Sequence, residues 1–147
     1  MKEYTWVDMM EIMQDIRLFS SLHIRHSKKE GITTAQEMDL LSRIVFAEAP
    51  LTPHEITVQM GICKSAISRL IEHLEKKGFL KKQQSEKDKR SYVLLITEKG
   101  NQELDSTYRY YLEPIYHLKS VMKEEEFTLL ANQIKKANQL SQIEKNL

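Results

Sequence analysis

The spacing of apolar residues predicts a chain that is mostly helical. Over residues 5–27 apolar side chains recur every three or four positions, a stripe that is typical of one face of a helix. A second stripe follows Thr34, which forms a capping box with the glutamate three positions on, and is expected to continue to about Ala49. Pro50 then ends the helical pattern. The sequence therefore predicts two helices before residue 51.

The next segment carries the clearest helix boundaries. Thr52, Pro53 and Glu55 supply an N-cap, a first helical residue and a capping-box carboxylate. That helix is expected to be short, because Gly61 stands where a left-handed residue commonly ends a helix. A second helix is predicted from about Lys64 until Gly78, with four apolar residues spaced to face inward. These four are Ile67, Leu70, Ile71 and Leu74.

Residues 79–96 change to the period of β-strands. Two strands are predicted, at residues 80–84 and 92–96, and the second is rich in residues that favour strands. The polar sequence SEKDKRS, residues 85–91, connects them. After the hairpin, Thr97 can cap a helix that is expected to run to about Pro114, and a last helix is expected from Lys123 to about Ile143.

This order of elements predicts the fold class. A capped short helix, a glycine turn, a second helix and a hairpin are typical of a winged helix-turn-helix. We expect a single domain over residues 1–147, mainly α with a small antiparallel β wing, in which residues 34–97 form the winged helix-turn-helix. Residues 5–30 and 98–147 carry more apolar surface than that module can cover. Their helices are therefore expected to form a dimerisation layer against a second copy.

The charge is unevenly distributed along the chain. The whole chain has a formal net charge of +1. Residues 63–90, however, contain nine lysines and arginines and four carboxylates, so this segment is +5 and the remainder is −4. A basic patch on a nearly neutral protein indicates a local site for a polyanion.

The second helix of the module, the recognition helix, has the side chains that DNA reading needs. With its apolar residues inward, the outward row is Lys64, Ser65, Ser68, Arg69 and Glu72. Arginine can bond guanine in bidentate fashion and serine can reach a base edge or a phosphate, so Arg69 is the best candidate for base reading, followed by the two serines. Lys64 is expected to contact a phosphate. The alternative is an ordinary solvated helix face.

The hairpin tip supplies a second group of candidate DNA contacts. Lys87, Lys89 and Arg90 lie in a polar loop that can reach an adjacent minor groove, where narrow A·T tracts attract arginine. Asp88 is expected to pair with Arg90 and to hold it in one direction. The alternative is a solvated run of charges. The helix-turn-helix order that precedes the loop favours DNA binding.

Three short motifs follow one another in this part of the chain: Leu74–Glu75–Gly78, Asp88–Arg90 and Ile96–Thr97–Gly100. In these motifs, their order and their spacing, the chain resembles the MarR family (multiple antibiotic resistance regulators) of bacterial transcription factors. Each motif is weak alone, but the resemblance covers essentially the whole chain. Ala66 departs from the threonine or serine of many relatives, which puts one contact in doubt. Ile96 stands where the family commonly has leucine, which only replaces one apolar core residue with another.

The resemblance implies a homodimer that binds a pseudo-palindromic operator in double-stranded DNA. It implies a repressor of a nearby promoter that a small phenolic or lipophilic effector releases. Carried over by position, Ser65, Ser68 and Arg69 lie on the recognition helix, and Asp88 and Arg90 lie in the wing. No effector-binding residues can be named from the sequence.

Two kinds of residue raise the question of sensing. Cys63, the single cysteine, lies at the start of the recognition helix, where a helix N-terminus can lower the pKa of a thiol. No second cysteine is present in the sequence to form a disulfide with an oxidised Cys63. His23, His26 and His117 could approach one another across a dimer, yet no cysteine or carboxylate set completes a zinc site. We therefore expect no metal site and treat a metal- or redox-responsive regulator of the same fold as the alternative.

Aromatic and methionine clusters are candidates for an effector cleft. Four tyrosines lie near Pro114 and three methionines lie in the first helix. Such side chains can line an adaptable cleft, but at helical spacing they are more often core, which is the preferred interpretation. The tyrosines are Tyr108, Tyr110, Tyr111 and Tyr116, and the methionines are Met9, Met10 and Met13.

Enzymatic and membrane functions are not expected. The chain has no glycine-rich phosphate loop, no Ser-His-Asp arrangement and no metal-binding helix motif, so neither catalysis nor a cofactor is predicted. Acidic residues near the N-terminus do not fit a signal peptide, and the longest apolar run, residues 92–96, is too short to span a bilayer. The expected location is the cytoplasm. The remaining rival is a winged-helix docking module that does not bind DNA.

Overall fold

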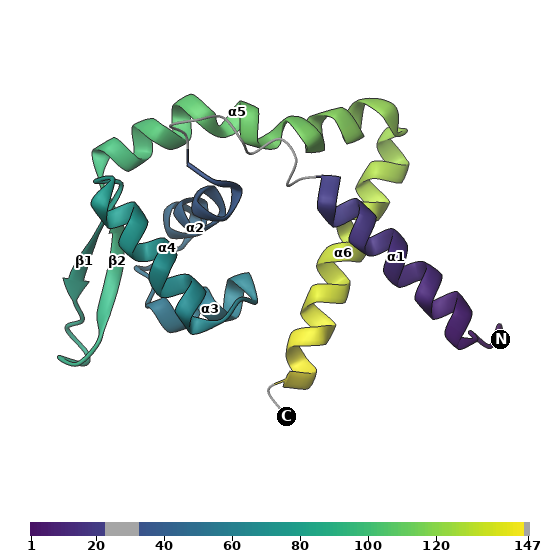
Figure 1. Cartoon of the computed structure of the whole chain (residues 1–147), viewed down its shortest axis with the longest axis horizontal. Coiled ribbons are helices and arrows are strands. Elements are labelled where there is room, and N and C mark those ends of the chain that lie inside the picture. Colours follow the sequence, from purple (N-terminus) through teal and green to yellow (C-terminus); the bar gives the residue numbers. More distant parts are fainter. Residues whose placement is uncertain (23–32, 146–147) are drawn as a thin grey trace. The chain divides into compact units, whose positions relative to one another are not determined.

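The computed structural model describes residues 1–22 and 33–145. Within them the chain is mainly helical with one small antiparallel sheet, which confirms the predicted fold class. The structure divides inside its fifth helix into two units, residues 1–111 and 112–147. The elements (Figure 1) are α1 (Trp6–Leu22), α2 (Ala35–Phe46), α3 (Pro53–Met60), α4 (Lys64–Lys76), β1 (Leu80–Gln84), β2 (Tyr92–Ile96), α5 (Glu98–Val121) and α6 (Glu124–Lys145).

The main hydrophobic core lies in the first unit, where α2, α3, α4 and the β1–β2 hairpin pack together (Figure 1). The four apolar residues predicted to face inward on α4 are all buried in it. Burying a leucine or isoleucine side chain contributes about 1.5–3 kcal/mol, so this cluster is the main source of stability for the unit. Its buried members are Leu40, Leu41, Ile44, Leu51, Ile56, Ile67, Leu70, Ile71, Leu74, Leu80 and Leu94.

The predicted capping residues set the helix ends. Thr34 begins α2 and Thr52 begins α3, each with a complete capping box to the glutamate three residues on. Gly61 ends α3 with φ +66°, in the left-handed region that glycine occupies without strain. These contacts fix the turn between α3 and α4 and therefore the direction in which α4 leaves it.

The wing is a two-stranded antiparallel hairpin whose strands match the predicted bounds. Leu80 pairs with Ile96 and Gln84 pairs with Tyr92. The hairpin is also attached to the chain before α3, because the Leu94 N–H donates to the Leu51 carbonyl at 2.9 Å. Strand β2 is thus bonded both to β1 and to the segment that leads into α3.

Two predicted helix ends are wrong. Helix α2 ends at Phe46, not near Ala49, and Ala47 is already extended with ψ 139°. The residue before Pro50 is disfavoured in the helical region, and the chain must extend so that Leu51 can pair with β2. Helix α5 does not end near Pro114 but continues to Val121. Proline cannot donate to the carbonyl four residues earlier, yet it leaves the remaining helical bonds intact.

The outer predicted helices agree more closely. Helix α1 lies within the predicted residues 5–27, and the end of that prediction lies outside the described residues. Helix α6 runs from Glu124 to Lys145, two residues beyond the predicted end. In the second unit the last turns of α5 lead through Met122 and Lys123 into α6, and the Lys123 N–H donates to the Glu126 carboxylate at 3.2 Å.

The junction between α4, β1 and α5 explains why two of the three motifs are spaced as they are. The Thr97 hydroxyl donates to the Gly78 carbonyl at 2.6 Å and accepts the Gly100 N–H at 3.0 Å. Thr97 therefore caps α5, as predicted, and also ties it to the end of α4. A Cβ atom on Gly100 would lie 2.2 Å from the Phe79 carbonyl oxygen, so only glycine fits this approach.

Candidate nucleic-acid interface

The outward row of α4 is exposed, as the periodicity of the sequence predicts. Lys64, Ser65, Ser68 and Arg69 are all exposed, on the side of the helix opposite the buried apolar residues. Within the described part of the chain, neither of the two cations forms an ion pair with a carboxylate. Their charge is therefore available to an external anion.

Cys63 occupies the N-cap position of α4 but does not cap it with its side chain. The exposed sulfur lies 3.2 Å from the Ser65 hydroxyl oxygen. That hydroxyl, followed by the backbone N–H of Ala66, lowers the pKa of the Cys63 thiol below its ordinary value, because both donors favour the thiolate. The lowered pKa favours the thiolate form of this side chain, which lies beside the outward row.

The wing tip is exposed and has an ordered backbone turn. The Asp88 carboxylate accepts the backbone N–H of Arg90 at 2.9 Å, and the Asp88 carbonyl accepts the Ser91 N–H at 3.0 Å. The predicted ion pair between Asp88 and the Arg90 guanidinium is not present. A short aspartate side chain reaches the N–H two residues on more easily than a distant guanidinium, which is the geometry of an Asx turn. Asp88 therefore orders the Arg90 backbone, and the Arg90 side chain forms no ion pair with any residue that the structure describes.

One pocket brings part of the predicted site together. A cavity of about 330 Å³ lies between α3, α4 and the wing, and Lys64, Ser68 and Arg90 all line it. Two residues of α3 that the sequence analysis did not select, His54 and Thr57, line the same pocket. Both residues lie on the helix directly before the recognition helix, and this position in the sequence could have pointed to them. The other predicted residues lie outside the lining: Ser65, Arg69, Lys87, Asp88 and Lys89.

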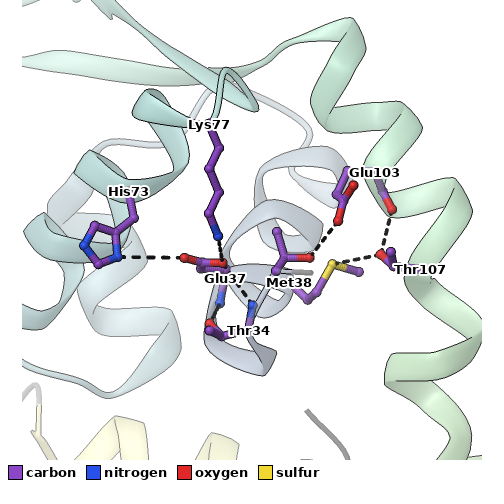
Figure 2. A network of polar contacts seen from close by, with 8 residues as sticks. Thr34, Glu37, Met38, His73, Lys77, Glu103 and Thr107 are labelled. Carbon is purple, nitrogen blue, oxygen red and sulfur yellow. Dashed lines mark hydrogen bonds and ion pairs between the residues drawn. The ribbon is translucent and has the colours of Figure 1, made fainter. Parts of the chain in front are cut away.

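A buried carboxylate fixes the far end of α4 to the scaffold (Figure 2). Glu37 on α2 is only 2% exposed and accepts a hydrogen bond from Lys77 Nζ at 2.8 Å. The His73 Nδ1 atom lies 3.9 Å from the other carboxylate oxygen, and the Thr34 N–H donates to Glu37 at 2.9 Å. One side chain therefore caps α2 and also anchors the last turn of α4 and its C-cap residue.

The opposite side of α2 is tied to α5 in the same network (Figure 2). The Thr107 hydroxyl donates to the Glu103 carbonyl at 2.6 Å and lies 3.4 Å from the Met38 sulfur. The Thr33 hydroxyl donates to the Glu103 carboxylate at 3.2 Å. Helix α2 is thereby fastened to both the recognition helix and α5.

The candidate sensing residues do not form a site in the described part of the chain. His23 and His26 lie outside the described residues, and His117 is exposed on α5. No three histidine, cysteine, aspartate or glutamate side chains among the described residues are grouped to hold a metal ion.

The tyrosine and methionine clusters are not core within one chain, contrary to the preferred interpretation. Tyr108 and Tyr116 are exposed, the latter by 50%, and all three methionines of α1 are exposed. Tyr111 is half-buried, and this burial followed by the nearby Asp39 carboxylate raises the pKa of its phenol. Most of the other large apolar residues of α1 are exposed as well, so its apolar stripe lies at the surface of the described chain.

No helix in the described ranges combines the length and the apolar character that crossing a membrane requires.

Comparisons with known proteins agree with this fold. The model of the MarR family matches residues 30–91, which contain α2 to α4, strand β1 and the connection that leads to β2. An HTH-type transcriptional regulator of Bacillus subtilis strain 168, the uncharacterised YkoM, is 30% identical over 119 residues, which are 81% of this chain and 76% of that protein.

Two solved structures share the fold at lower identity. A cysteine-to-serine mutant of MarR from E. coli, in complex with operator DNA, has a TM-score of 0.77 and 19% identity, with 92% of this chain and 99% of that chain covered. BpsR of Bordetella bronchiseptica, whose DNA binding is regulated by 6-hydroxynicotinic acid, has a TM-score of 0.76 and 12% identity, with 86% and 98% covered. The family model, the relative of 30% identity and the winged helix-turn-helix described above together establish that the chain belongs to the MarR family of transcriptional regulators.

Proposed function

We propose that this regulator is a homodimeric repressor that binds a pseudo-palindromic operator in double-stranded DNA. The observation that carries the proposal is the exposed row of polar and cationic side chains on α4, opposite its buried apolar face; within the described residues, neither Lys64 nor Arg69 forms an ion pair. The fold neighbour MarR was crystallised with operator DNA, which supports the same use of this fold. Two α4 helices of a dimer would enter successive major grooves, roughly 10 bp apart.

The residues of α4 have different roles in this proposal. Arg69 reads a base, because a guanidinium can donate two hydrogen bonds to guanine O6 and N7. Ser65 and Ser68 contact base edges or phosphates, and Lys64 contacts a phosphate and so fixes register without reading sequence.

The wing residues supply contacts next to the half-site. Lys87, Lys89 and Arg90 approach the adjacent minor groove, where a narrow A·T tract concentrates negative potential. Asp88 contributes indirectly, since its bond to the Arg90 N–H holds the turn from which that side chain projects.

The dimer is supported by apolar side chains that one chain leaves exposed. Trp6 is 78% exposed, and most of the other large apolar residues of α1 are exposed as well. Leu129, Ile134 and Leu140 of α6 are also exposed. Exposed apolar surface of this extent marks an interaction site, and a second copy supplies a matching one. Residues 5–30 and 98–147 are therefore assigned to the dimer layer and residues 34–97 to DNA binding.

An effector that releases the repressor completes the proposal. BpsR responds to a hydroxylated aromatic acid, which supports a small phenolic or lipophilic effector for a chain of this fold. Because the target is bacterial DNA, the protein is assigned to the cytoplasm, with no cofactor and no catalytic step.

The test is fluorescence anisotropy with the DNA upstream of the protein's own gene, measured against random competitor at several salt concentrations. Lys64→Ala is expected to weaken specific and random binding equally, whereas Arg69→Ala is expected to remove about 1–3 kcal/mol from specific binding alone. Both variants lose one charge from the same helix, so charge alone cannot explain a difference. Lys135→Ala on α6 removes the same charge far along the sequence and is expected to change nothing.

The wing and the dimer have their own readouts. Arg90→Ala is expected to weaken binding and to change the preference for A·T pairs that flank the half-sites. Sedimentation velocity is expected to give twice the chain mass, and Met13→Glu is expected to shift it towards the monomer.

Equal loss on specific and random DNA for Arg69→Ala would remove its base-reading role. Failure to bind any DNA at low salt would replace the repressor with a docking module.

A further inference from the structure

The pocket between α3, α4 and the wing is lined by four cationic or polar side chains that have no side-chain partner among the described residues. His54 comes from α3, Lys64 and Ser68 come from α4, and Arg90 comes from the wing. Within the described residues, none of these four side chains takes part in an ion pair or a side-chain hydrogen bond with the rest of the chain. The neighbouring Thr57 differs, since its hydroxyl already donates to the Pro53 carbonyl at 2.9 Å.

The charge of the lining fits an anion. Lys64 and Arg90 are basic side chains, and no aspartate or glutamate is among the residues that line the pocket. On α3 itself the next charged residue is Glu55, whose carboxylate is already held by the Thr52 N–H at 2.7 Å. Nothing in the pocket therefore offsets its positive potential.

We propose that this pocket receives one phosphate of the operator backbone and that His54 is a phosphate-contacting residue which makes DNA affinity depend on pH. The inference rests on the proposed function, because the occupant is DNA. Lys64 and Ser68 belong to the exposed row of α4, so a duplex that reaches that row passes the mouth of the pocket. Arg90 adds positive potential from the wing side and keeps its own assigned contact.

The histidine gives the site a property that lysine and arginine do not have. Histidine is the side chain that ordinarily changes charge between about pH 5 and 8. The protonated imidazole donates a charge-assisted hydrogen bond to a phosphate oxygen, whereas the neutral form donates only an ordinary one. Since bound phosphate favours the protonated form, linkage requires DNA to bind more tightly as the pH falls through this range.

The experiment compares the full-length protein with His54→Gln by anisotropy at about pH 6 and about pH 8. A random-sequence duplex at low salt is the probe, because a backbone contact does not depend on the operator sequence. The wild type is expected to bind about five- to tenfold more tightly at the lower pH, and the dependence of log K on log salt is expected to be steeper there by about one. His54→Gln is expected to lose both differences.

His117→Gln, which removes another exposed histidine, is the matched control and is expected to retain both differences. A second measurement follows the His54 ring by NMR. Its protonation curve is expected to move to higher pH when duplex is added, and the missing signal of His54→Gln assigns it. Unchanged pH dependence in His54→Gln, or an unmoved protonation curve, would overturn the phosphate contact. A wild type that binds no DNA would instead overturn the proposed function.

Discussion

Removing the Glu37 side chain tests whether a single carboxylate holds the end of the recognition helix. Glu37→Ala deletes the reciprocal half of the α2 capping box, a loss of about 0.5 kcal/mol for an acidic group in a first turn. It also deletes the hydrogen bond from Lys77. Because the Lys77 side chain is 40% exposed and can return to water, this deletion is expected to lower the free energy of unfolding by about 1 kcal/mol. The lost packing of a side chain that is 2% exposed adds about 1 kcal/mol.

We therefore expect Glu37→Ala to lower the free energy of unfolding by about 2–3 kcal/mol, a large share of the stability of a typical domain. The matched control is Glu55→Ala, which breaks the same type of capping box on α3 at an exposed position and should cost only about 0.5 kcal/mol. Urea denaturation followed by circular dichroism, at one fixed protein concentration, measures both values.

A double-mutant cycle isolates the ion pair from the other losses. Glu37→Ala and Lys77→Ala are expected to be non-additive by about 1 kcal/mol, because the second substitution removes nothing once the first has been made. Additivity within error, or a Glu37→Ala variant no less stable than Glu55→Ala, would refute the anchoring role. The variants that lose this anchor should also bind DNA more weakly at temperatures where both remain folded.

Three further predictions concern other parts of the chain. Gly100→Ala places a Cβ against the backbone of Phe79 and should cost about 3 kcal/mol, which lowers the thermal midpoint by about 10 °C; an unchanged midpoint would contradict this. Because the pKa of the Cys63 thiol is lowered chiefly by the Ser65 hydroxyl, iodoacetamide should alkylate this thiol faster than free cysteine near neutral pH. Ser65→Ala should slow the reaction, and equal rates in the wild type and in Ser65→Ala would refute the role of that hydroxyl. Because the pKa of Tyr111 is raised, the folded state keeps the phenol proton to higher pH than the unfolded state does, so stability should fall as the pH rises above about 10. Tyr111→Phe should remove the last phenolate component to form in an absorbance titration, and persistence of that component would contradict the assignment.

The parts of the fold that could be predicted are those with local causes. Pro53 and Gly61 act within one helical turn, so both ends of α3 were predictable, and the buried face of α4 followed from its period. The end of α2 was not, because the pairing of Leu51 with Leu94 joins residues that are far apart in the sequence. The passage of α5 through Pro114 was also missed, since a proline weakens a helix without obliging it to stop.

The candidate site divides in the same way. The exposure of Arg69 and its neighbours followed from helical periodicity, and the hairpin tip followed from its composition. The hydrogen bond between Glu37 and Lys77 joins residues 40 positions apart, and no sequence pattern predicts it. His54 was overlooked for a related reason, because its importance depends on a pocket that three separate elements create.

The backbone bond between Leu94 and Leu51 has a consequence for protein engineering. It makes the segment before α3 a third, one-residue member of the wing's sheet, so the wing cannot be exchanged as a simple cassette of residues 80–96. A chimera that imports a foreign wing must also import or match the connection that follows α2, with its length from Ala47 to Leu51 unchanged. Lengthening that connection by one residue would move the Leu51 carbonyl out of register and tilt the hairpin while leaving every residue of the hairpin itself untouched.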